Sequence, residues 1–103
     1  TKGAVRALTK AVALELATSK IRVNAVLPGP VPTNLSASWD PPLDEQGNPF
    51  TAEQALAAWA RLIPLGRPGA VSDIAPLVAY PASDLAGFIT GSAFIADGGY
   101  TAA

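Results

Sequence analysis

The stretch Ile21–Asn34, IRVNAVLPGPVPTN, decides how the rest of the chain is interpreted. Residues 21–27 contain five apolar and three β-branched side chains, a pattern that predicts a mostly buried strand. The strand is expected to stop at Pro28, because proline cannot donate to a sheet, and the glycine that follows adopts backbone angles closed to other residues. Thr33 then offers a hydroxyl group. Ligands of open α/β sheets bind at the carboxyl ends of strands, so residues 28–33, here called the elbow, are a candidate ligand site.

Composition limits the kinds of protein that this chain can be. It has 103 residues, 50% of them hydrophobic, so we expect at most one small domain with a buried core. The net charge of −1 favours neither nucleic acid nor an anionic membrane surface as a partner. The chain has no Cys and no His, which excludes disulfides, thiol catalysis, Cys/His zinc sites and histidine-based triads, and we predict no metal site.

The chain shows no targeting or membrane-spanning pattern. No apolar run approaches the roughly 18 residues that a membrane span needs, and the first segment is helical and charged rather than signal-like. We therefore expect a cytoplasmic protein with no membrane partner, with which the lack of Cys is compatible. The helical pattern follows directly on Thr1, with no Met before it, so we expect the chain to begin inside a longer sequence.

The spacing of apolar residues predicts a first helix over Gly3–Ser19. Two apolar stripes run along it, one of them mostly alanine, so the helix is expected to be buried on more than one side, for instance against a sheet and a partner subunit. A tight loop leads from it into the strand of residues 21–27. Helix, tight loop and strand make half of an α/β unit.

A long polar segment separates this unit from the rest of the chain. Residues 35–50 have loop composition, and Thr51 is placed to cap a short helix over Ala52–Arg61, with Gln54 completing a capping box. A long loop beside a ligand-binding elbow is often a lid or a specificity loop, so we predict a substrate loop over about residues 34–62.

The last third of the chain predicts one more helix and one more strand. Ser72 is expected to cap the helix, Asp73 suits the helix dipole in its first turn, and Pro81 is expected to end it. A short strand over Ser92–Ala96 follows, and Asp97-Gly98-Gly99 is expected to be a structural turn that closes it.

Six short motifs occur in one order along the chain: Thr1–Val5, Ile21–Val26, Pro28-Gly29-x-Val31-x-Thr33, Gly66–Pro68, Phe88–Gly91 and Asp97–Gly99. Each motif alone is weak, whereas six in order at compatible spacing are specific. Together they resemble the C-terminal part of a short-chain dehydrogenase/reductase of the classical type. The resemblance covers essentially all of residues 1–103 and is least defined over residues 35–50.

The resemblance implies an α/β fold. Residues 1–103 would form the C-terminal part of a Rossmann-type doubly wound parallel sheet, in a single NAD(P)-binding domain. The order would be a helix, the sixth strand, the helices of the substrate loop, a packing helix and the seventh strand. The glycine-rich phosphate turn, the first five strands, and the catalytic Tyr and Ser would lie outside this chain.

The resemblance also implies a catalytic role for Lys2. In the family pattern Tyr-x-x-x-Lys, the tyrosine would lie three residues before Thr1. The Lys2 ammonium would lower the pKa of that phenol and bind the ribose hydroxyls of the cofactor, NAD or NADP. By itself, a lysine at the start of a helix is more often a solvated surface charge.

The resemblance makes the elbow the nicotinamide side of the cofactor site, with Pro28, Gly29, Val31 and Thr33 as cofactor-binding residues. Gly29 would let the backbone approach the ring, and the Val31 backbone and the Thr33 hydroxyl would pair with the carboxamide. The alternative is an ordinary turn at the exit of a strand. Leu35 and Trp39 would contact the substrate, although Trp39 could equally cover core surface.

Two functions follow from these patterns. The first is an NAD(P)-dependent oxidoreductase that transfers hydride between nicotinamide and a small carbonyl or alcohol substrate, a homotetramer or homodimer in its full length. The second is a non-catalytic fragment or structural module, since the chain alone would lack the catalytic tyrosine and is expected to be inactive. We interpret Asn24 and Arg67 as structural residues, and Trp59 as a residue that covers core surface.

Overall fold

The computed structural model describes residues 2–34 and 40–102. These residues form two compact units. The first unit comprises the described residues up to Pro28 together with Val71–Ala96. The second comprises the described residues of Gly29–Ala70 and those from Asp97 onward. None of the helices that the structure describes is both long and apolar enough to cross a lipid bilayer.

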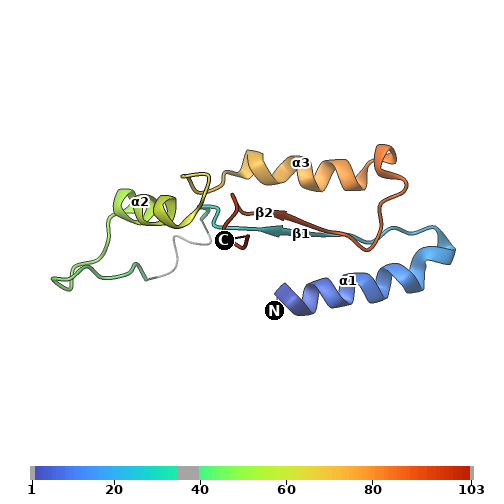
Figure 1. Cartoon of the computed structure of the whole chain (residues 1–103), viewed down its shortest axis with the longest axis horizontal. Coiled ribbons are helices and arrows are strands. Elements are labelled where there is room, and N and C mark those ends of the chain that lie inside the picture. The colour runs from blue at the N-terminus through green and yellow to red at the C-terminus, as the bar shows by residue number, and fades with distance from the viewer. Residues whose placement is uncertain (1, 35–39, 103) are drawn as a thin grey trace. The chain divides into compact units, whose positions relative to one another are not determined.

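The first unit is a small α/β layer arrangement. Strands β1 (Ala25–Pro28) and β2 (Ala93–Ala96) pair in parallel, with Ala25 opposite Ala93 and Pro28 opposite Ala96. Helices α1 (Lys2–Leu16) and α3 (Val71–Ala82) lie on opposite sides of the two strands (Figure 1). Short 3-10 turns follow each helix, η1 (Ala17–Ser19) and η3 (Asp84–Ala86). A parallel pair covered by helices confirms the predicted fold class.

Helix α1 buries one side only within the described residues. Its buried residues are Thr9 and Ala13, and the Thr9 hydroxyl donates to the carbonyl oxygen of Val5 over 2.7 Å. Leu8 and Leu14 remain 64% and 79% exposed. Within the described residues, α1 is therefore covered on one side, and apolar side chains on the rest of the helix are open. Burial of the second stripe by a partner subunit stays a prediction.

Strand β1 is shorter at its start than the predicted strand over residues 21–27, and it includes Pro28 at its end. Just before β1, hydrogen bonds of the Asn24 side chain take the place of the backbone hydrogen bonds of a regular sheet. The Asn24 amide donates to the carbonyl oxygen of Ile89 over 3.0 Å and accepts from the Ser92 N–H over 3.1 Å. The interpretation of Asn24 as a satisfied structural amide is confirmed. Pro28 fits because a terminal strand position does not require its missing N–H.

Helix α3 is longer than expected at both ends. It begins at Val71, so Ser72 lies inside the helix and is not its cap. It runs through Pro81 to Ala82, so the expectation that Pro81 ends the helix is wrong. Arg22 supplies the physical reason, because its guanidinium group donates to the carbonyl oxygens of Pro81 and Ser83 and so satisfies the helix terminus. Asp73 lies in the first turn as predicted.

The second unit contains α2 (Ala52–Leu62), whose predicted capping box is present. The Gln54 N–H donates to Thr51 Oγ1 over 3.1 Å, and the Thr51 N–H donates to Gln54 Oε1 over 2.9 Å. Ahead of the helix, Leu43 and Pro49 form an antiparallel bridge around a turn held by the Asp44 carboxylate. Part of the predicted loop is therefore a small hairpin.

Candidate functional site

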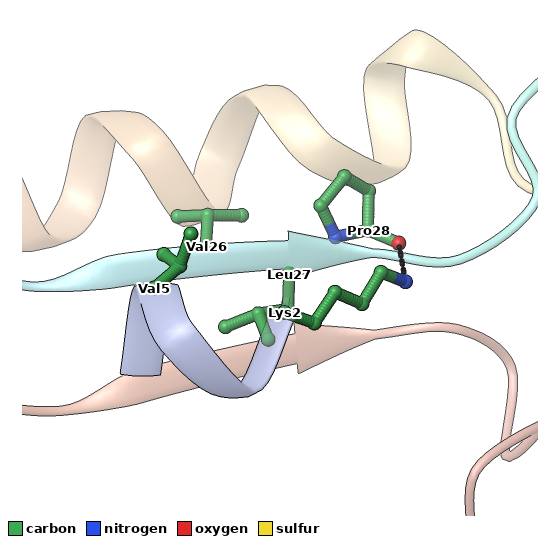
Figure 2. A pocket seen from close by; sticks show the side chains of 5 residues that line it. All are labelled: Lys2, Val5, Val26, Leu27 and Pro28. Atoms are coloured by element: carbon green, nitrogen blue, oxygen red, sulfur yellow. Dashed lines mark hydrogen bonds between the residues drawn. The ribbon is translucent and has the colours of Figure 1, made fainter. Parts of the chain in front are cut away.

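Lys2, the predicted catalytic residue, is the first residue of α1 and has an exposed side chain. Its ammonium nitrogen Nζ donates to the carbonyl oxygen of Pro28 over 3.1 Å (Figure 2). Pro28 is the last residue of β1 and the first of the elbow. The fold thus brings together two predicted site residues that are 26 positions apart in sequence.

A shallow pocket of about 160 Å³ lies beside this hydrogen bond. Five residues line it: Lys2, Val5, Val26, Leu27 and Pro28 (Figure 2). Its walls are mainly aliphatic, and Lys2 is the charged group among them. An ammonium group has three N–H donors, and the structure assigns one of them to Pro28. The arrangement can therefore hold an uncharged, partly apolar group and donate hydrogen bonds to hydroxyl groups at its edge.

Gly29 follows Pro28 and lies against Asp97, the residue that follows β2. A Cβ atom built on Gly29 would lie 2.6 Å from Asp97 Cβ and 2.7 Å from Asp97 Cα. No side chain fits at such distances, so the position requires glycine for packing. The role predicted for Gly29 toward a cofactor stays a prediction. Sequence reasoning missed this contact, because it depends on the register that aligns the ends of the two strands.

The carboxylate of Asp97 stabilises the turn that follows Asp97 in the sequence. Its carboxylate accepts from the Gly99 N–H over 2.9 Å, from the Thr101 N–H over 3.0 Å and from the Thr101 hydroxyl over 2.5 Å. Gly98 takes a positive φ of 63° and packs against Ile63, which is only 3% exposed. The interpretation of Asp97-Gly98-Gly99 as a structural turn is confirmed.

The rest of the elbow belongs to the second unit. The carbonyl oxygen of Pro30 accepts from the Gly69 N–H over 2.8 Å. Val31 is half-buried and Thr33 is exposed. The predicted substrate contacts, Leu35 and Trp39, lie outside the described residues.

Two further residues named in the sequence analysis, Trp59 and Arg67, make contacts within the second unit. Trp59, expected to cover core surface, meets Tyr100 edge-on, with ring centroids 6.1 Å apart, and stays 40% exposed. Arg67 donates to the carbonyl oxygen of its neighbour Pro68 over 3.1 Å. In residues 2–34 and 40–102, no group of three or more carboxylates is arranged to hold a metal ion.

Comparison with known proteins assigns the family. A family model described as "Enoyl-(Acyl carrier protein) reductase" matches residues 1–101. The chain belongs to the short-chain dehydrogenase/reductase family. It matches the C-terminal portion of that family, as its six motifs indicated.

Relatives in the short-chain dehydrogenase/reductase family include enzymes of several bacteria. The chain is 42% identical over 100 residues to 3beta-hydroxysteroid dehydrogenase 1 of Eggerthella lenta, covering 97% of this chain and 34% of the relative. It is 40% identical over 100 residues to cyclohexanol dehydrogenase of an Acinetobacter species, covering 97% of this chain and 34% of the relative. The chain thus spans about a third of the length of these relatives.

Solved structures agree with the fold. A structure of 4-hydroxyisoleucine dehydrogenase complexed with NADH superposes with a TM-score of 0.80 at 34% identity, covering 99% of this chain and 38% of that chain. The neighbour is a Rossmann-type short-chain dehydrogenase/reductase, so the predicted Rossmann-type fold is confirmed.

Proposed function

We propose that the protein containing this chain is an NAD(P)-dependent oxidoreductase that transfers hydride between nicotinamide and a carbonyl or alcohol carbon. The observation that carries the proposal is the 3.1 Å hydrogen bond from Lys2 Nζ to the carbonyl oxygen of Pro28. It joins the residue assigned to catalysis to the first residue of the elbow assigned to the nicotinamide. Membership of a family of oxidoreductases supports the same conclusion.

The residues around Lys2 fit a nicotinamide nucleotide. The pocket beside Lys2 is walled by aliphatic side chains, which suits an apolar ring face. The Lys2 ammonium is placed to donate to ribose hydroxyls while it keeps its bond to Pro28. When bound, the cofactor supplies or accepts the hydride. In this proposal the Val31 backbone and the Thr33 hydroxyl hold the carboxamide and so select the ring face.

Lys2 acts in this proposal through its positive charge. A tyrosine four positions before a lysine lies on the same face of a helix. The Lys2 ammonium then favours the phenolate form and lowers the pKa of that tyrosine, which serves as the acid/base. By itself, the 103-residue chain is proposed to be inactive, since the family pattern places that tyrosine before Thr1.

The substrate class that we propose is a small alcohol or the corresponding carbonyl compound. The three relatives described above are named for a hydroxysteroid, cyclohexanol and 4-hydroxyisoleucine, all of them alcohols. The substrate loop over about residues 34–62 is proposed to contact the substrate. The exposed apolar side chains of α1, Leu8 and Leu14 among them, support a homodimer or homotetramer.

The test uses the full-length protein that contains this chain. NADH and NADPH are titrated separately by nicotinamide fluorescence, and turnover is then measured with a panel of secondary alcohols and ketones. Lys2→Met should lower kcat/KM by about 100-fold or more. Lys10→Met removes an exposed lysine from the same helix and should leave kcat/KM unchanged. A wild-type protein that binds neither nucleotide, or a Lys2→Met variant with wild-type turnover, would refute the proposal.

A further inference from the structure

The two paired strands bring their following residues into direct contact. Pro28 and Ala96 form the last pair of the parallel register. The next residues, Gly29 and Asp97, approach so closely that a Cβ atom on Gly29 would lie 2.7 Å from Asp97 Cα. The first bend of the elbow therefore rests on the backbone of Asp97. A shift of the Asp97 backbone toward Gly29 therefore has to displace Gly29, since Asp97 already fills the space that a Cβ atom would need.

The backbone of Asp97 is itself fixed by its carboxylate. The carboxylate accepts hydrogen bonds from the Gly99 N–H and from both the N–H and the hydroxyl of Thr101. Hydrogen bonds to a charged acceptor are stronger than those between neutral groups. We call residues 97–101, which these bonds hold, the C-terminal turn. Removal of the carboxylate would take away these three hydrogen bonds and release the C-terminal turn.

A third segment connects the elbow and the C-terminal turn through backbone hydrogen bonds. The Leu65 N–H donates to the carbonyl oxygen of Gly98 over 3.1 Å, and the Gly69 N–H donates to the carbonyl oxygen of Pro30 over 2.8 Å. Residues 63–69 thus touch the C-terminal turn at one end and the elbow at the other. All of these contacts lie within the second unit.

We infer that Asp97 is a positioning residue for the nicotinamide end of the cofactor site, acting through Gly29 and the elbow. The inference rests on the proposed function, because the elbow is the segment proposed to hold the carboxamide. It goes beyond that function because it gives the C-terminal turn a role in positioning the nicotinamide. Loss of the Asp97 carboxylate should loosen contacts to the nicotinamide and leave contacts to the adenosine end unchanged.

The experiment compares two ligands on the full-length protein. Asp97→Ala should weaken NADH binding by about tenfold, the effect of losing hydrogen bonds to a charged group. Affinity for ADP-ribose, which has no nicotinamide, should stay within about twofold of wild type. Asp97→Asn should recover part of the NADH affinity. Asp84→Ala, which removes an exposed carboxylate of the first unit, serves as the control and should bind both ligands as wild type does.

Two outcomes would overturn the inference. Unchanged NADH affinity in Asp97→Ala would show that the turn does not position the elbow, and equal losses for NADH and ADP-ribose would show a general defect. If Asp97→Ala does not fold, Thr101→Val, which removes one of the hydrogen bonds, decides between the same outcomes.

Failure of the proposed function is recognised separately. In that case the wild-type protein binds neither NADH nor NADPH. Amide hydrogen exchange of Gly29, Val31 and Thr33, the residues of this stretch other than proline, then tests the positioning role without a ligand. Exchange should speed up in Asp97→Ala relative to wild type, while exchange in α1 stays the same. Unchanged exchange of residues 29–33 would contradict the positioning role.

Discussion

The guanidinium group of Arg22 donates a hydrogen bond to the carbonyl oxygen of Pro81, near the end of α3. It also donates to Ser83 over 3.0 Å and, at 3.4 Å, to Ile89. One side chain therefore closes the end of a helix and holds the connection that leads to β2. This links the segment before β1 to two segments that are far away in sequence.

Replacement of Arg22 should destabilise the protein. Arg22→Met leaves the carbonyl groups of Pro81 and Ser83 without their donor in a partly buried place, so we expect a loss of about 2–3 kcal/mol in the free energy of unfolding. Denaturant unfolding of the full-length protein measures it. Arg6→Met, at an exposed position of α1, is the matched control and should change stability by less than about 0.5 kcal/mol.

Replacement of glycine by alanine should have opposite effects on stability at Gly29 and at Gly3. Gly29→Ala places a Cβ atom 2.6 Å from Asp97 Cβ, so it should lower the melting temperature and weaken NADH binding. Gly3→Ala meets nothing within 4 Å and lies in α1, where alanine favours the helix by about 0.5–1 kcal/mol. Thermal unfolding of both variants of the full-length protein tests this. A Gly29→Ala variant as stable as wild type would show that the elbow and Asp97 separate easily.

Removal of the capping box should loosen α2. Thr51→Ala deletes the hydroxyl that accepts from the Gln54 N–H, which should cost about 1 kcal/mol. Amide exchange in the first turn of α2 should rise accordingly. Thr51→Ser keeps the hydroxyl and should exchange as wild type does. Faster exchange in both variants would mean that the methyl group, rather than the cap, holds the helix start.

The 103 residues expressed alone should not unfold cooperatively. In the described part of the chain few apolar residues are buried, namely Ala13, Ala25, Leu27, Ile63 and Ala86. Three of these five are alanines, which bury little apolar surface. Phe88 and Leu14 are exposed, and a two-stranded sheet is marginal without further strands. Circular dichroism at low micromolar concentration should give a broad thermal transition. A sharp transition would contradict this expectation.

Local chemistry was predictable from the sequence, and tertiary contacts were not. The capping box of Thr51 and the turn at Asp97 each follow from a residue and its near neighbours. The apolar neighbours of Asn24 indicated a satisfied amide, but its partners, Ile89 and Ser92, come from a distant segment. The C-terminal end of α3 depends on a side chain that approaches from elsewhere, that of Arg22. No pattern of spacing in the sequence contains that information.

The candidate site likewise has a part that the sequence could predict and a part that it could not. The resemblance to a family indicated Lys2 and the elbow, and the structure joins Lys2 to Pro28. The packing of Gly29 on Asp97 required knowledge of which residues the two strands place opposite one another. A Pro-Gly after one predicted strand and an Asp-Gly-Gly after the next were the available signal.

The pairing of β1 with β2 has a consequence for synthesis on the ribosome. β1 ends at Pro28, and its partner begins only at Ala93. At the usual ~5–20 residues per second, β1 waits several seconds for its partner strand to be translated. During that time Gly29 lacks its contact with Asp97, and the edge of β1 can pair with strands of other chains. The nascent protein is therefore exposed to misassembly, and to chaperones, until β2 emerges.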